Sequence, residues 1–408
     1  MMRLRNFFPL RWARSGLPGR CLLALMLAAL LTQCGGGGET KTGSNGTGIS
    51  PPVDDALVAS GPITALGPTG IGGTTLDDAT ALVQIDAAIP RPIGDIRLGM
   101  VTEASGSIAA DASRGTARTL SAQSAVIGPV TAINPAARQL TVLTVQVQAD
   151  QNTILDGIPS LAAIAAGMRL EVYGLPQPQS GAITATRIIA LPPDSAAPVE
   201  ILGTATGLTS SQFNLQGVVV STGSAVLIVG GAQPSPAPPV ATIGENARVR
   251  VVGSFDATRN TLSATQVIGG LNPVRNDNSV LVLDGLVQSV SGAGRFRVSD
   301  TDVDATAAGG GTLAAGAHVQ VRGRKLAGIL IASQFRQIAA SDRIEYVVQG
   351  EITDFVPPAS FKVRGEAINA ATATLVGLPA SLANGRQARV KAVAGPGQLT
   401  ATEVTLLP

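Results

Sequence analysis

Four short motifs recur in the same order along most of this 408-residue chain, and this repetition limits its possible folds more than any other feature. The first motif is a glycine followed by an alternating apolar segment, and its copies begin at Gly61, Gly128, Gly203, Gly285 and Gly350. The intervals between these glycines are 67, 75, 82 and 65 residues. The chain is therefore predicted to fold as a series of similar small units.

The second motif consists of two apolar residues separated by one position, and it follows the first motif in four units. Its copies are Leu140-Thr-Val142, Phe213-Asn-Leu215, Phe296-Arg-Val298 and Phe361-Lys-Val363. In the last three copies a turn residue follows two positions later, at Gly217, Asp300 and Gly365, and a further apolar segment comes next. This spacing is typical of a β-hairpin.

The third motif is Gly-x-x-h-x-h-x-Gly, where h is apolar, and the fourth is Leu or Ile followed by x-Ala. The third motif is complete in residues 167–174 and 316–323, and Asn246 replaces its first glycine in residues 246–253. Because asparagine tolerates positive φ better than most residues, we expect a turn at Asn246. The copies of the fourth motif begin at Leu120, Ile183, Leu262, Leu330 and Leu399. The small alanine that ends the fourth motif suggests close approach of two strands.

The alternation of apolar and polar residues predicts strands with one buried and one solvated face. Each unit has about five such strands, and short strands must close on themselves to hide their edges. We therefore predict an all-β protein, a tandem array of about five small five-stranded OB-like or SH3-like barrels. Repeat 1 is degenerate, since Thr102 and Ala104 replace the usual valines. The predicted barrels are repeat 1 (57–125), repeat 2 (126–191), repeat 3 (199–271), repeat 4 (278–338) and repeat 5 (344–408).

Residues 1–33 resemble the signal peptide of a bacterial lipoprotein. Five arginines and no acid precede an eleven-residue apolar run, which is shorter than the roughly 20 residues a membrane-spanning helix needs. Leu31-Thr-Gln-Cys34 resembles the lipobox, although Gln33 stands where that motif usually has a small residue. The resemblance implies cleavage before Cys34 and lipidation of Cys34. Residues 34–56 are rich in glycine, serine and threonine and are predicted to be a flexible tether.

Removal of the signal peptide changes the charge balance. Five of the 29 basic residues and none of the 27 acidic ones leave, so the formal charge falls from +2 to −3. A chain without basic excess and with few aromatic side chains is a poor match for nucleic acid, so we predict no nucleic-acid partner. By resemblance, Gly35 after the lipidated cysteine favours the outer membrane. The membrane, through Cys34, is the one partner that the sequence predicts directly.

Few residues offer catalytic or metal-binding chemistry, and we predict no catalytic, cofactor-binding or metal-binding residue. His318 is the only histidine, so a histidine triad or a zinc site within the chain lacks partners, and its place in the alternation predicts a solvated position. Asp300, Asp302 and Asp304 are the best acidic constellation. They could bind a cation such as calcium, but the glycine and glutamate of an EF-hand loop are absent. Asp300 also occupies the predicted turn position, which favours a structural role.

The Cys-Gly-Gly-Gly-Gly start followed by the four repeated motifs resembles bacterial outer-membrane lipoproteins with tandem domains of an uncharacterised family. That family has no established activity, so the resemblance implies no site residues beyond Cys34. We predict a non-catalytic, lipid-anchored cell-envelope protein, a structural or binding array with an envelope protein or polysaccharide as partner. The alternative is an envelope enzyme that acts on a cell-wall or carbohydrate substrate through carboxylates alone.

Overall fold

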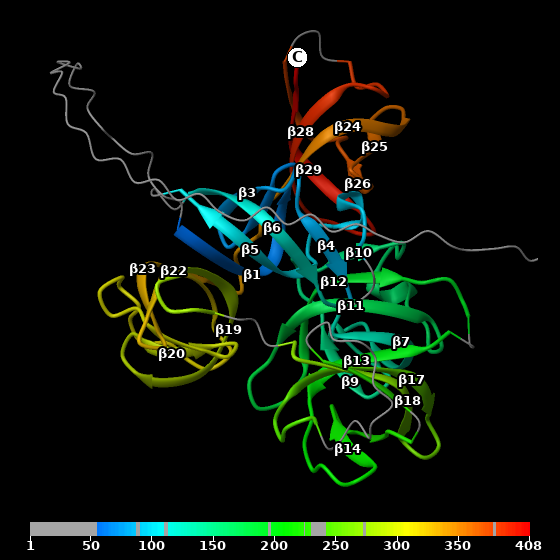
Figure 1. Cartoon of the computed structure of the whole chain (residues 1–408). Helices are drawn as coiled ribbons and strands as arrows, with labels where there is room; N and C mark the ends of the chain where they lie inside the picture. The colour runs from blue at the N-terminus through cyan, green and yellow to red at the C-terminus, as the bar shows by residue number, and fades with distance from the viewer. Residues whose placement is uncertain are drawn as a thin grey trace, which may run out of the picture. The chain divides into compact units, whose positions relative to one another are not determined.

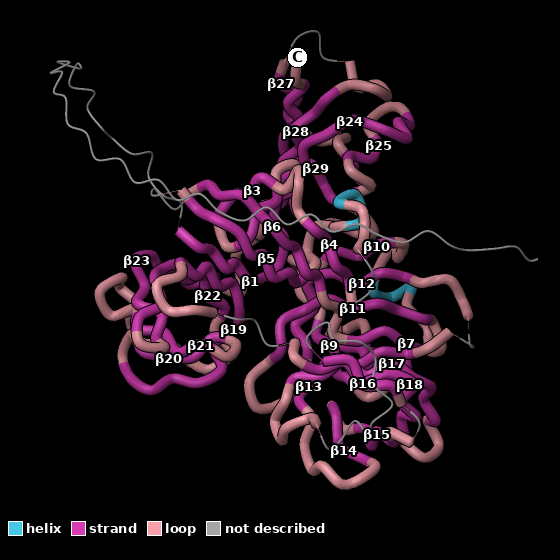
Figure 2. The backbone as a smooth tube through the Cα atoms, viewed as in Figure 1, coloured by secondary structure: helices cyan, strands magenta, loops and turns pink. Residues whose placement is uncertain are grey.

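The computed structural model describes residues 55–86, 90–109, 113–194, 197–223, 225–229, 242–271, 275–377 and 381–408 (Figure 1). These residues form 29 strands and two short 3-10 helices, Ile93–Asp95 and Leu161–Ala163 (Figure 2). The prediction of an all-β protein is therefore confirmed, and the second 3-10 helix lies in the alanine-rich stretch before Gly167. The signal peptide, Cys34 and residues 34–54 of the tether lie outside the described residues.

Repeat 2 shows how one unit closes. Its strands are β7 (Val126–Asn134), β8 (Gln139–Val142), β9 (Val145–Gln148), β10 (Ile154–Asp156), β11 (Arg169–Pro176) and β12 (Ile183–Ala190). β7 pairs antiparallel with β8, β8 with β9, β11 with β12 and β11 with β7. β9 pairs parallel with β12, which completes the ring, and β10 also pairs parallel with β12. The ring is a small five-stranded barrel without a free edge.

The same pairings recur around the other four units. In repeat 3 the contact between the first two strands is a single bridge, between Thr206 and Asn214. In repeat 4 the described residues include no counterpart of β10, the short fourth strand of repeat 2. The strands are β1 (Asp55–Leu66), β2 (Thr69–Ile71), β3 (Thr74–Asp77), β4 (Leu82–Ile85), β5 (Val101–Ile108) and β6 (Arg114–Ala122) in repeat 1; β13 (Val199–Thr204), β14 (Gln212–Leu215), β15 (Val218–Ser221), β16 (Val226–Val229), β17 (Arg248–Asp256) and β18 (Thr261–Gly269) in repeat 3; β19 (Val280–Gly292), β20 (Arg295–Val298), β21 (Thr301–Asp304), β22 (His318–Leu326) and β23 (Ile329–Ile338) in repeat 4; and β24 (Tyr346–Val356), β25 (Ser360–Val363), β26 (Glu366–Asn369), β27 (Thr374–Val376), β28 (Gln387–Ala394) and β29 (Leu399–Leu406) in repeat 5.

The motifs occupy the turns and bulges of this ring. The second motif forms the first strand of the predicted hairpin in repeats 2 to 5, and Gly217, Asp300 and Gly365 lie in its turns. Asn246 has a φ of 64°, as its place in the third motif predicts. The motifs were therefore a reliable guide to local backbone geometry.

A β-bulge explains the last glycine of the third motif and the alanine of the fourth. The register between the two long strands shifts just before Gly174 pairs with Ala185, and again just before Gly323 pairs with Ala332. A Cβ atom at Gly323 would overlap the carbonyl oxygen of Ile331, so no larger residue fits there without a backbone shift. In repeat 1 the residue in this position is Ala117, so the prediction that Leu120 begins that copy of the motif was wrong.

Three further strand pairings join barrels to one another. β7 of repeat 2 pairs antiparallel with β13 of repeat 3. β1 of repeat 1 pairs parallel with β19 of repeat 4 and, further along, with β24 of repeat 5. These pairings merge the barrels into one 12-stranded and one 17-stranded sheet. Barrels that are distant in the sequence are thus direct neighbours, which a simple string of units would not allow.

Candidate functional site

The three acids of the predicted constellation do not converge. Arg297 donates from Nη1 to Asp302 Oδ1 at 2.9 Å, and Arg295 Nε donates to Asp304 Oδ2 at 3.1 Å. Asp300 forms an ion pair with Arg275. Hydrogen bonds from Thr306, together with Arg295, lower the pKa of Asp304. Within the described ranges no group of three or more histidine, cysteine, aspartate or glutamate side chains could hold a metal ion.

Asp302→Ala is expected to change the free energy of unfolding by less than about 1 kcal/mol, because exposed ion pairs contribute about 0.2–1 kcal/mol. The side chains of Asp302 and Arg297 are 60% and 42% exposed. Urea denaturation measures this change. Calorimetric titration of the unmodified chain with millimolar calcium should give no binding heat. A saturable heat that disappears in Asp302→Ala would establish the cation site instead.

His318 is not the solvated residue that its alternation predicts. Its Nε2 lies 2.6 Å from Oδ1 of the buried Asp284, which also accepts a hydrogen bond from Gln320 Nε2 at 2.7 Å. β1 of repeat 1 pairs with β19 as far as Leu283 and then passes against Asp284. A Cβ atom at Gly61 of β1 would come within 2.5 Å of the Asp284 Cβ. Outward polar positions of a barrel are therefore buried where another barrel packs on them.

Arg250 occupies a comparable outward position in repeat 3 and is fully buried. Its guanidinium lies 2.6 Å from Asp86 Oδ1 of repeat 1 and 3.0 Å from Glu200 Oε2 of repeat 3, and it donates to the Ser124 carbonyl at 2.8 Å. We call this group, together with Glu171 of repeat 2, the Arg250 junction. It joins charged side chains from three different barrels.

Glu171 is the least compensated acid of the Arg250 junction. Burial raises its pKa to about 7, and the Asp86 and Glu200 carboxylates act in the same direction. The hydroxyl of Tyr173, which donates to Glu171 Oε1 at 2.5 Å, and the charge of Arg250 only partly oppose this rise. The junction thus places three carboxylates around one arginine, so that a proton on Glu171 reduces the repulsion among them.

A second buried group, the Arg187 junction, joins repeats 1, 2 and 5. Arg187 is 1% exposed and donates from Nη1 to Glu366 Oε2 at 3.0 Å and to the Leu98 carbonyl at 2.9 Å. Its Nη2 forms an ion pair with Asp156. The backbone N–H of Leu98 donates to Glu366 Oε1 at 2.9 Å. Each junction encloses a buried arginine between barrels and pairs it with carboxylates, which suits a structural role.

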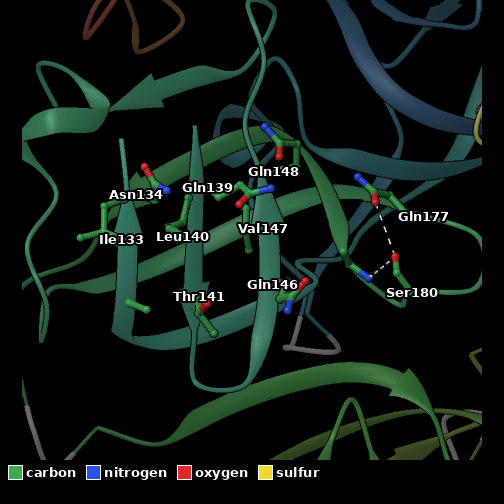
Figure 3. Close-up of a pocket in the computed structure, with 12 residues that line it drawn as sticks. Ile133, Asn134, Gln139, Leu140, Thr141, Gln146, Val147, Gln148, Gln177 and Ser180 are labelled. Atoms are coloured by element: carbon green, nitrogen blue, oxygen red, sulfur yellow. Dashed lines mark hydrogen bonds between the residues drawn. The ribbon is translucent and has the colours of Figure 1, made fainter. Parts of the chain in front are cut away.

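The open pocket of repeat 2 is different in character. A cavity of about 320 Å³ lies beside β7, β8 and β9, over apolar residues that include Leu140 and Val147 (Figure 3). Its polar lining consists of amide and hydroxyl side chains without any charged group: Asn134, Gln139, Thr141, Gln146, Gln148, Gln177 and Ser180. Gln177 and Ser180 hydrogen-bond to each other at 3.5 Å, at one side of the pocket in Figure 3. Amides and hydroxyls both donate and accept hydrogen bonds, so this lining suits a neutral polar ligand.

The sequence contained only a weak signal for this pocket. Gln139, Thr141, Gln146 and Gln148 are the outward positions of two alternating strands, and outward polar residues are ordinary in any barrel. The contribution of Gln177 and Ser180, which come from the other end of repeat 2, depends on closure of the ring. Sequence reasoning therefore missed the pocket.

Residues 127–189 and 349–405 each match the protein family described as a domain of unknown function, DUF5666. The two segments span the strand rings of repeats 2 and 5 and cover less than a third of the chain. The expectation of a repeated, uncharacterised domain is thereby confirmed. A search of the curated proteins found no match to the chain. The described residues include no helix that is both long and apolar enough to cross a membrane.

Proposed function

We propose that this chain is a non-catalytic, lipid-anchored cell-envelope protein whose repeat 2 binds a neutral polysaccharide. The observation that carries the proposal is the uncharged amide and hydroxyl lining of the open pocket in repeat 2. Sugar hydroxyls both donate and accept hydrogen bonds, and the lining offers partners for both roles. General acid–base catalysis needs titratable groups within reach of the ligand. The polar side chains that line this pocket are amides and hydroxyls, which do not titrate in the ordinary pH range.

The envelope location rests on residues 1–34. The signal-peptide pattern and Cys34 support an outer-membrane lipoprotein, held by acyl chains that contribute about 0.8 kcal/mol per buried CH₂ group. The alternative of a carboxylate enzyme finds no favourable geometry in Asp300, Asp302 and Asp304, because each is paired with its own arginine. A polysaccharide-binding array is therefore the better proposal.

The binding test is a calorimetric titration of the full chain in detergent with neutral trisaccharides of glucose, galactose and N-acetylglucosamine. At least one is expected to bind saturably, and a Gln139→Ala/Gln146→Ala double variant should bind it at least fivefold more weakly, since each lost hydrogen bond contributes about 0.5–1.5 kcal/mol. Gln212→Ala is the matched control, because Gln212 begins β14 as Gln139 begins β8. No saturable binding, or equal weakening in the control, would refute the pocket.

The anchor is tested separately by Cys34→Ser. This variant should lose acyl labelling and leave the membrane fraction, because no other lipidation site is proposed. If Cys34→Ser remains membrane-bound and acyl-labelled, the proposed location is wrong. The result does not depend on whether the pocket binds sugar.

A further inference from the structure

A continuous sheet crosses from repeat 1 into repeat 5. Val347 of β24 pairs with Ala65 of β1, Ala65 with Gly70 of β2, Gly70 with Thr75 of β3, and Thr75 with Arg114 of β6. Directly paired residues present their side chains on the same face of a sheet. This row therefore has its smallest residues at the centre and larger ones at both ends, which leaves a depression along the boundary between the two barrels.

The depression is enforced by close strand packing. A Cβ atom at Gly70 would lie 2.7 Å from the Ala65 Cβ, so a larger residue does not fit in this register. The open space above the row measures about 700 Å³ and is lined by residues of both repeats, Pro68 and Gln349 among them. We call this space the repeat 1–5 groove. Its volume falls within the roughly 300–1,000 Å³ typical of ligand sites.

Four charged side chains line the repeat 1–5 groove, two from each barrel. Asp77 and Arg114 belong to repeat 1, and Glu345 and Arg389 belong to repeat 5. All four are exposed. Among the described residues Arg114, Glu345 and Arg389 have no hydrogen-bonding or ion-pair partner for their side chains, and Asp77 accepts only from the backbone N–H of Ala79. These charges are therefore available to a ligand, unlike those of the buried junctions.

The strand directions place opposite charges across the groove. β3 and β24 run the same way, since β24 is parallel to β1 and β2 is antiparallel to both β1 and β3. Asp77 lies two residues beyond Thr75, and Arg389 pairs with Gln349, two residues beyond Val347. Asp77 and Arg389 thus lie toward one end of the groove. Glu345, two residues before Val347, lies toward the other.

We infer that the repeat 1–5 groove binds a short, extended peptide that carries both an amino group and a carboxylate. Asp77 and Glu345 would pair with the amino groups, and Arg114 and Arg389 with the carboxylates. Thr75 and Gln349 provide hydrogen-bonding groups for the peptide backbone. A polyanion such as nucleic acid would meet two carboxylates, and a neutral glycan would leave all four charges unused. This site goes beyond the proposed function, since it lies on different barrels from the pocket of repeat 2.

The test is a calorimetric titration of the full chain in detergent with the free tetrapeptide Lys-Ala-Ala-Glu. It is expected to bind saturably with one peptide per chain, whereas acetyl-tetraalanine amide should not bind. Arg389→Ala and Glu345→Gln should each weaken binding about fivefold, since accessible ion pairs contribute up to about 1 kcal/mol. Arg336→Ala, an exposed arginine of β23 outside the groove, is the control and should leave the affinity unchanged.

Charge reversal adds an outcome that a merely structural effect would not produce. Glu345→Lys should lose affinity for Lys-Ala-Ala-Glu but bind the more acidic Glu-Ala-Ala-Glu more tightly than the unmodified chain does. Absence of saturable binding by the charged peptide, or equal affinities in the groove variants and the unmodified chain, would overturn the inference. The neutral trisaccharide titration probes the pocket of repeat 2, and the peptide titration probes the repeat 1–5 groove. The absence of binding at one site therefore leaves the result for the other site unchanged.

Discussion

Arg187→Met is expected to lower the free energy of unfolding by about 3–5 kcal/mol, because it leaves a buried carboxylate without its partner. Glu366 is 2% exposed, and its only described cationic partner is Arg187. The variant also removes the donor to the Leu98 carbonyl, one of two adjacent hydrogen bonds from repeat 2 to repeat 1, the other running from Thr186 to the Gly99 carbonyl. Urea denaturation followed by circular dichroism measures the loss.

A double variant distinguishes the loss of this ion pair from the loss of the other contacts of Arg187. Arg187→Met/Glu366→Gln should be more stable than Arg187→Met alone, because it removes the uncompensated charge while the glutamine oxygen can still accept from the Leu98 N–H. Arg297→Ala, which breaks an exposed ion pair, is the control and should cost less than about 1 kcal/mol. A loss in Arg187→Met no larger than in this control would show that the junction contributes little to stability.

Glu171→Gln is expected to leave stability nearly unchanged at pH 4.5 and to increase it by up to about 3 kcal/mol at pH 8.5. The native pKa of Glu171 is about 7, against 4.5 for the ordinary carboxyl. Between these values the native state holds a proton that the unfolded state has released, so stability falls as pH rises and levels off above about pH 7. The difference between these two pKa values corresponds to about 3 kcal/mol. Glutamine mimics the protonated form and does not titrate.

The measurement is the difference in unfolding free energy between Glu171→Gln and the unmodified chain at several pH values, which cancels the titration of all other groups. The charges that face Glu171 are Asp86, Glu200 and Arg250, and Tyr173 donates to it. Glu351→Gln, on an exposed position of β24, serves as the control for the loss of one carboxylate. A difference for Glu171→Gln that does not change with pH would mean that the junction does not retain its proton.

The local elements could be predicted because their causes are local. Asn246 takes positive φ, and the alanine of the fourth motif lies at a bulge beside a glycine, because these steric limits act between near neighbours of one hairpin. The full burial of Arg250 and the partial burial of His318 could not be predicted. Alternation identifies the outward face of a strand, but solvent covers that face only where no second barrel packs on it.

The difference between local causes and packing between barrels also applies to the candidate sites. Asp300, Asp302 and Asp304 form a visible pattern in the sequence. Cross-strand arginines pair with Asp302 and Asp304, however, and Arg275 from the segment before β19 pairs with Asp300. The repeat 1–5 groove has no motif, since its walls come from strands that are far apart in the chain. The pocket of repeat 2 lies beside three consecutive strands, and only ring closure adds Gln177 and Ser180 to it. A sequence shows which residue types are present, but a binding surface requires that they be brought together.

The all-β class and the repeated hairpins could be predicted from the sequence, because they follow from side-chain alternation and from the turn residues between strands. The pairing of β1 with both repeat 4 and repeat 5, and the enclosure of Arg187 and Arg250 between barrels, appear only in the folded chain. They could not be predicted because strand edges and charged outer faces can pair with many partners. The partner is selected by the packing of whole barrels, which no single repeat encodes.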